Sequence, residues 1–179
     1  MAVKAKAQRA YDLAFNYEKN EKNCSQSTIK ALLEVYGEKN KSDYYQYLAG
    51  FSAGGACLGD GCCGAYAAGI FFFGLKTGRR IEDVGINPDD PRGSSKNMDN
   101  FMLVQKLHDK FIEEFGSVTC HHIHRKLYGR SYNITDSDEK EKFEKAGAHD
   151  WGCTNVCGLG AKWTVEIYED YLKQKKGEN

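Results

Sequence analysis

Proline occurs at only two positions in the 179-residue sequence, Pro88 and Pro91, and both lie in one segment rich in Asn, Asp and Gly. No proline interrupts the rest of the chain, so long helices can form there. Apolar residues recur at helical spacing, and the strict alternation typical of strands is scarce. The length suits one domain that buries a core without disulfide bonds. We therefore predict an all-α fold, a single-domain helical bundle of roughly seven or eight helices over residues 1–179.

Helix boundaries follow from this spacing and from capping residues. Asn23, with Gln26 three residues later, has the pattern of an N-cap with its capping-box partner. Gly78 and Gly116 are placed to end helices, and residues 86–95 are predicted to form a polar loop. The expected helices span residues 4–19, 24–36, 42–52, 62–76, 95–115, 118–128, 137–148 and 153–175.

Charge and hydropathy exclude several classes of function. The chain has 25 basic and 25 acidic residues, so its net charge gives no argument for binding nucleic acid or an anionic membrane surface. Residues 1–11 are polar and basic and do not resemble a secretory signal. The most apolar stretch, residues 61–75, is shorter than the roughly 20 residues that a spanning helix needs. We expect a cytoplasmic protein that neither binds nucleic acid nor inserts into a membrane.

Seven cysteines carry most of the functional information. Because their number is odd, they cannot all form disulfides within the chain, and in a reducing cytoplasm cysteines are more typical of metal binding or catalysis. The alternative for any single cysteine is a small core residue, since free cysteine buries well. The seven are Cys24, Cys57, Cys62, Cys63, Cys120, Cys153 and Cys157.

Four cysteines that are far apart in the sequence lie near predicted helix starts. They are Cys24, Cys63, Cys120 and Cys153. At a helix N-terminus the dipole favours the thiolate, which is the form that binds metals and attacks disulfides. Backbone N–H groups there can also donate hydrogen bonds to sulfur. We therefore expect several helix ends to converge on one metal or redox site.

The local cysteine spacings are less specific. Cys57-x4-Cys62-Cys63 is a dense set on a glycine-rich loop, and Cys153-x3-Cys157 places two sulfurs one helical turn apart. Neither is the Cys-x-x-Cys pair of zinc ribbons or thioredoxins. The spacings indicate a soft metal or a redox centre and do not select the metal.

Three segments and a late cysteine follow a known order. They are residues 23–26 (Asn-Cys-Ser-Gln), residues 63–69 (Cys-Gly-Ala-Tyr-Ala-Ala-Gly), residues 115–120 (Phe-Gly-Ser-Val-Thr-Cys) and a cysteine before the last apolar helix. Over about residues 10–172 the chain resembles the C_GCAxxG_C_C family of redox-active proteins. The small residues Gly64, Ala65 and Gly69 would let another helix or a cofactor approach the backbone.

The resemblance implies a helical protein with four redox-active cysteines, and a related domain occurs in multihaem cytochromes that also carry an iron–sulfur centre. The shared set would be Cys24, Cys63, Cys120 and Cys153. Cys157 could take the role of Cys153, and Cys57 and Cys62 are further departures from the family pattern. No Cys-x-x-Cys-His sequence is present, so covalent haem is not expected.

The leading hypothesis is a protein that holds an iron–sulfur cluster on the shared set and exchanges electrons with a redox partner protein. The other three cysteines would be additional ligands or nearby thiols. One alternative is a metal-free thiol–disulfide oxidoreductase that uses Cys62–Cys63 and Cys153–Cys157. Another is a binding module with a structural zinc, which needs only four ligands. Catalysis and oligomeric state stay open, and a cluster shared by a homodimer is compatible with the sequence.

The histidines allow two interpretations. His121 and His124 share a helical face beside Cys120. In one interpretation they are surface residues. In the other they have a function, either as part of a mixed Cys/His site or as proton carriers during reduction. His108 and His149 are expected to be ordinary polar residues.

Overall fold

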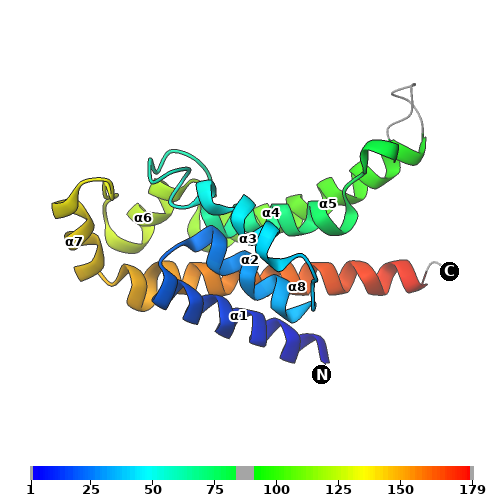
Figure 1. Ribbon diagram of the computed structural model, residues 1–179, viewed down its shortest axis with the longest axis horizontal. Coiled ribbons are helices and arrows are strands. Elements are labelled where there is room, and N and C mark those ends of the chain that lie inside the picture. Colours follow the sequence, from blue (N-terminus) through cyan, green and yellow to red (C-terminus); the bar gives the residue numbers. More distant parts are fainter. Residues whose placement is uncertain (1, 84–90, 178–179) are drawn as a thin grey trace.

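The structure is a computed structural model that describes residues 2–83 and 91–177 (Figure 1). The described residues form eight α-helices and no strand, which confirms the all-α prediction. None of these helices has the length and apolar character that crossing a bilayer requires. The helices are α1 (Ala2–Glu21), α2 (Cys24–Val35), α3 (Lys41–Tyr47), α4 (Gly64–Thr77), α5 (Pro91–Phe115), α6 (Cys120–Tyr128), α7 (Ser137–Lys145) and α8 (Cys153–Gly177), with short helices η1 (Ala49–Phe51), η2 (Ile81–Asp83) and η3 (Ala148–Gly152) between them.

Helices α2, α4 and α8 pack together and run in the same direction. Near their C-terminal ends the Tyr36 ring lies 5.0 Å from the Phe72 ring and 5.5 Å from the Tyr168 ring, centroid to centroid. At the opposite end the first residue of α4, Gly64, lies against Cys24, the first residue of α2. The three helices therefore begin at the same end of the bundle.

Helix α1 runs antiparallel along α8. Lys6 forms an ion pair with Glu169 at 2.6 Å, and the Tyr11 hydroxyl donates to Asn155 Oδ1 at 2.7 Å. Figure 1 shows α6 and α7 at the end of the bundle where α2 and α8 begin, away from both chain termini. The two short helices thus cover the end at which the three parallel helices start.

The core lies between α1, α2, α4, α5 and α8. Phe72 and Phe111 are fully buried, and each such side chain contributes roughly 1.5–3 kcal/mol of hydrophobic stabilisation. A Cβ at Gly69 would lie 2.4 Å from Leu107 Cδ2 and 2.7 Å from Thr164 Oγ1. The predicted role of Gly69 in close helix packing is therefore confirmed.

Helix boundaries differ from the prediction at several helix ends. Helix α4 begins at Gly64 because Cys63 is extended and its N–H donates to Val118 O at 2.8 Å, outside the helix. The helix expected to reach residue 52 ends at Tyr47 and is followed by the 3-10 helix η1. The loop predicted for residues 86–95 is wrong for 91–95, because α5 starts at Pro91, a position that suits proline's fixed φ and missing N–H. Residues 86–90 of that loop lie outside the described residues.

The N-cap of α2 is confirmed, with one difference. Asn23 Oδ1 accepts a hydrogen bond from the Gln26 N–H at 3.2 Å and another from the Ser52 hydroxyl. The Gln26 side chain does not complete the capping box and donates instead to Tyr45 O at 3.1 Å. Asn23 therefore joins the start of α2 to the loop that follows η1.

Replacing Asn23 by alanine should lower the free energy of unfolding by about 1 kcal/mol, with about 2 kcal/mol as the upper end for such caps. The variant loses the bond to the Gln26 N–H and the contact with Ser52. Asn40→Ala is the matched control, because Asn40 is the N-cap of α3 and makes no side-chain capping bond. Urea unfolding measures both variants, and equal losses would contradict the capping role of Asn23.

Candidate functional site

A cavity of about 190 Å³ lies at the end of the bundle where α2, α4, α6 and α8 begin. One water molecule needs only about 10–15 Å³ of such space, so the cavity has room for a much larger group. Six of the seven cysteines line it, and Cys62 is the one that does not. The six are Cys24, Cys57, Cys63, Cys120, Cys153 and Cys157.

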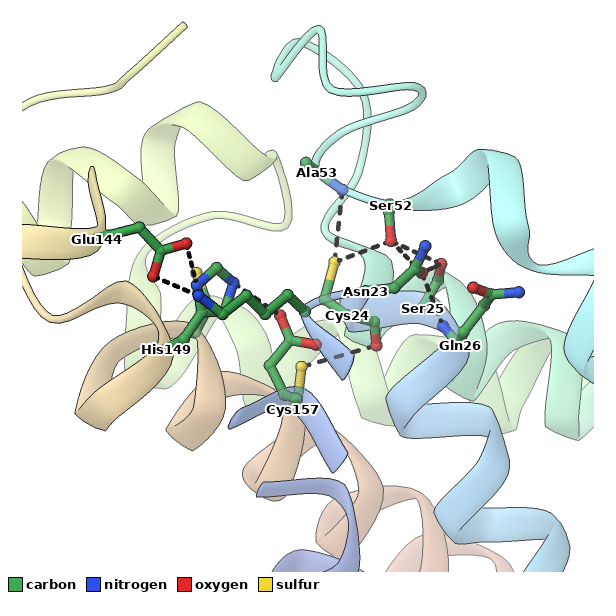
Figure 2. A network of polar contacts seen from close by, with 12 residues as sticks. Asn23, Cys24, Ser25, Gln26, Ser52, Ala53, Glu144, His149 and Cys157 are labelled. Carbon is green, nitrogen blue, oxygen red and sulfur yellow. Dashed lines mark hydrogen bonds and ion pairs between the residues drawn. The ribbon is translucent and has the colours of Figure 1, made fainter. Parts of the chain in front are cut away.

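The positions of these cysteines follow from the helix directions. Cys24, Cys120 and Cys153 are the first residues of α2, α6 and α8, and Cys63 is the N-cap of α4. Since α2, α4 and α8 run in parallel, their first residues meet. Cys157 follows Cys153 by one turn and its thiol donates to the backbone oxygen of Cys24 at 3.6 Å (Figure 2). The structure therefore brings the four cysteines of the shared set together, while their role as ligands stays a prediction.

The start of α6 is held in place by the loop before α4. Cys62 and Thr119 form an antiparallel bridge, and the Cys120 N–H donates to Gly61 O at 3.0 Å. Adjacent residues of an extended segment point to opposite sides, so Cys62 faces away when Cys63 faces the cavity. This backbone pairing explains why one of two neighbouring cysteines lines the site.

The loop between η1 and α4 covers the cavity in a strained conformation. Five consecutive residues, 53–57, have positive φ, and the non-glycine residues Ala53, Ala56 and Cys57 have φ of 50°, 47° and 68°. The left-handed conformation costs roughly 1–2 kcal/mol for each non-glycine residue. It directs the Ala53 N–H to Cys24 Sγ at 3.4 Å, as Figure 2 shows, and brings Cys57 into the cavity wall. Such strain is typical of functional sites.

Five of the six thiols that line the cavity are held in their neutral form. Burial raises the pKa of Cys24 to about 11, although N–H groups of Ala53 and Gly64 favour the thiolate. Burial also raises the pKa of Cys63, Cys120, Cys153 and Cys157. The expectation that helix N-termini would produce thiolates is therefore wrong for the metal-free site, because desolvation outweighs the helix dipole. A metal that binds here has to displace protons from sulfur.

His124 is the histidine that belongs to the site. It is 5% exposed, and its Nε2 lies 3.6 Å from Cys120 Sγ and 3.8 Å from Cys153 Sγ. Burial lowers its pKa to about 4, so the ring is neutral at pH 7. His121 does not line the cavity. The spacing of four residues from Cys120 to His124 was the signal for this pair, since such residues share a helical face.

Three further side chains at the site were not expected. The Tyr128 hydroxyl donates to Cys153 Sγ at 3.5 Å. His149, predicted to be an ordinary polar residue, lines the cavity with its Nε2 3.7 Å from Glu18 Oε1 and its Nδ1 2.9 Å from Glu144 Oε1. The carboxyl of Glu18 also lines the cavity and is 2% exposed as a residue. The sequence contains a signal for the burial of Glu18, because this residue lies four positions after Ala14 and so shares the buried face of α1.

We expect Glu18 to make the stability of the metal-free protein depend on pH. Burial raises the Glu18 pKa from an ordinary 4.5 to about 8, so the folded state holds this proton more tightly and stability falls as the pH rises between these values. The pKa of His124 is lowered from its ordinary value of 6.5. His124 therefore affects the free energy of unfolding only below pH 6.5, where stability falls as the pH drops. Glu18 therefore dominates between pH 6.5 and 8, where we expect a loss of about 1–2 kcal/mol.

Glu18→Gln should remove most of this loss. Glu21→Gln is the control, because Glu21 lies on the same helix and pairs with Lys30 at the surface. Chemical unfolding of the metal-free proteins at several pH values measures the effect. A slope that is the same in Glu18→Gln and in the wild type would exclude Glu18 as its source.

Within the described ranges, no three His, Cys, Asp or Glu side chains lie close enough together to hold one metal ion. Six cysteines line the walls of one cavity instead. An arrangement of this kind leaves space between the donors for a group of several atoms.

Fold and site together define a class: an all-helical protein with a buried, cysteine-lined cavity at converging helix starts. Residues 22–167 match the family described as Putative redox-active protein (C_GCAxxG_C_C). The match covers most of the chain, so the protein belongs to this family, as the sequence resemblance indicated. Comparison with curated proteins and with solved structures gives no match.

Proposed function

We propose that this protein binds an iron–sulfur cluster in the cysteine-lined cavity and uses it for electron transfer or redox sensing. Membership of a redox-active family supports the general function. The observation that carries the cluster is the set of six cysteines around one largely buried cavity. Cysteine thiolates are the usual ligands of iron–sulfur clusters. Cys24, Cys63, Cys120 and Cys153 would be the ligands, with Cys57 and Cys157 as further ligands or nearby thiols.

The size of the cavity and the number of its cysteines favour a cluster over a structural zinc. Zinc–sulfur bonds are about 2.3 Å long, so the ligands of one zinc lie roughly 4 Å from one another. His124 Nε2 lies this close to Cys120 Sγ and Cys153 Sγ, at 3.6 and 3.8 Å, but no three side chains in the described part of the chain form a group that could hold one metal ion. A cavity of about 190 Å³ between the sulfurs suits a group that contains several metal and sulfide atoms.

Metal-free thiol–disulfide exchange has weaker support. The thiolate is the attacking form, and burial raises the pKa of both members of the Cys153–Cys157 pair. In the second pair, Cys62 does not line the cavity with Cys63. Neither pair therefore has the environment of an activated nucleophile.

The chain's own residues would tune the bound group. A cluster supplies one-electron chemistry when it is bound, and hydrogen bonds to its sulfurs raise its reduction potential. The Ala53 N–H, the Gly64 N–H and the Tyr128 hydroxyl are donors to cysteine sulfur here. Ile123, Val156 and Phe143 line the cavity with apolar surface and limit the access of water.

The test is to measure iron, zinc and acid-labile sulfide in anaerobically purified protein, together with its visible and electron paramagnetic resonance spectra. Iron and sulfide with an absorption band that reduction bleaches are the expected result. Protein that stays without iron after anaerobic reconstitution would overturn the proposal. In that case, stoichiometric zinc would indicate the structural site, and disulfide reduction by metal-free protein would indicate thiol chemistry.

A further inference from the structure

Glu18 carries a buried oxygen atom, Oε2, that accepts no hydrogen bond of good geometry. The residue is 2% exposed and lines the cysteine cavity, and the Ser27 side chain and the Asn23 backbone are the polar groups that lie beside its carboxyl and favour its charged form. Its other oxygen, Oε1, lies 3.7 Å from His149 Nε2. Burying a carboxyl group without a partner is costly, and buried polar atoms in folded proteins are almost always satisfied. The unused oxygen therefore points to something that binds in the cavity.

The surroundings of Glu18 offer it no dedicated cation. Lys22 also lines the cavity, but its Nζ is paired with Glu144 Oε2 at 3.0 Å. His149 lies between the carboxyl groups of Glu18 and Glu144 and makes its shorter contact with Glu144. In Figure 2, Glu144 and His149 lie on one side of Cys157. Cys24 and its hydrogen-bond partners lie on the other side.

Glu18 also shares the cavity with the sulfurs. Cys24, Cys153 and Cys157 line the same cavity as its carboxyl. A bond from Oε2 to a metal ion held there would satisfy the oxygen atom that accepts no hydrogen bond of good geometry.

We propose that Glu18 is an oxygen ligand to one iron of the group bound in this cavity. The inference depends on the proposed function, because it assigns a ligand to the same cluster. The bond forms between Oε2 and iron, and the carboxyl proton leaves to solvent. Carboxylate oxygen is an established iron ligand in proteins. An iron that carries this oxygen would differ from the irons that are held by thiolates alone.

The differing iron has a functional consequence. The cavity wall also includes Lys22, Lys140 and Ile134, which are at least partly exposed, so the cavity reaches the surface. An iron held by Glu18 would then be the one that chelators and small molecules could reach most readily.

The experiment compares anaerobically purified wild type, Glu18→Gln and Glu21→Gln after growth with ⁵⁷Fe. Mössbauer spectra should resolve one iron in the wild type that differs from the thiolate-bound irons. In Glu18→Gln this iron should be lost or changed, with the sulfide content kept, while Glu21→Gln should match the wild type. Identical spectra and iron contents in wild type and Glu18→Gln would overturn the assignment.

Iron K-edge X-ray absorption of the wild type keeps the test independent of how well the variant folds. A shell of oxygen or nitrogen neighbours is expected, and coordination by sulfur alone would overturn the Glu18 ligand. Wild-type protein that lacks iron would overturn the proposed function and this ligand with it. A wild-type cluster that is unaffected by Glu18→Gln would overturn the ligand alone.

Discussion

Replacing Cys63 by serine should remove most of the iron from anaerobically purified protein. Cys63 is buried, lines the cavity and stands at the N-cap of α4, next to the cysteines that begin α2 and α6. Serine has nearly the same shape, but its hydroxyl is a poor replacement for a thiolate at a soft metal site. The loss should therefore reach well over half of the wild-type iron content, while circular dichroism shows that the helices are kept.

The neighbouring cysteine is the matched control for this variant. Cys62 does not line the cavity, and its backbone forms the bridge to Thr119. Cys62→Ser should keep its iron and its spectrum. Full iron content in Cys63→Ser would remove Cys63 from the ligand set. Equal losses in both variants would mean that the cavity is not the metal site.

Much of the fold could be predicted because its signals are local. The N-cap at Asn23 depends on residues three positions apart, and the all-α class follows from apolar spacing and the rarity of proline. The convergence of cysteines was predictable in part, since each lies near a local helix-start signal. The parallel direction of α2, α4 and α8 makes those starts meet, and it depends on packing over the whole chain.

The parts that could not be predicted depend on long-range contacts. Cys63 lies outside α4 because its N–H bonds to Val118, which is 55 positions later in the chain. His149 becomes a site residue through Glu18 and Glu144, which lie on two other helices. The pKa of the thiols depends on burial, which a helix-dipole argument from sequence does not include. In each case tertiary structure decides which of several local possibilities is realised.

Gly64→Ala should both destabilise the protein and disturb the site. A Cβ at this position would lie 2.4 Å from Cys24 Sγ and 2.8 Å from the Ser25 backbone nitrogen. Because one of these neighbours is backbone, α2 and α4 have to move apart, and overpacking of this kind costs typically about 1–3 kcal/mol. Cys24 has to move as well, so we expect the variant to bind less iron than the wild type.

Gly74→Ala separates the steric effect from the ordinary effect of alanine in a helix. Gly74 lies in the same helix with nothing within 4 Å of the added Cβ. There alanine should raise the free energy of unfolding by about 0.5–1 kcal/mol through its better helix propensity.

Denaturant unfolding of the metal-free variants gives the two stabilities, and iron content gives the effect on the site. We expect the free energy of unfolding to fall in Gly64→Ala and to rise in Gly74→Ala, with iron lost only in Gly64→Ala. This result would show that the small residue at the start of α4 sets the position of Cys24. A Gly64→Ala protein as stable and as iron-rich as the control would contradict that link.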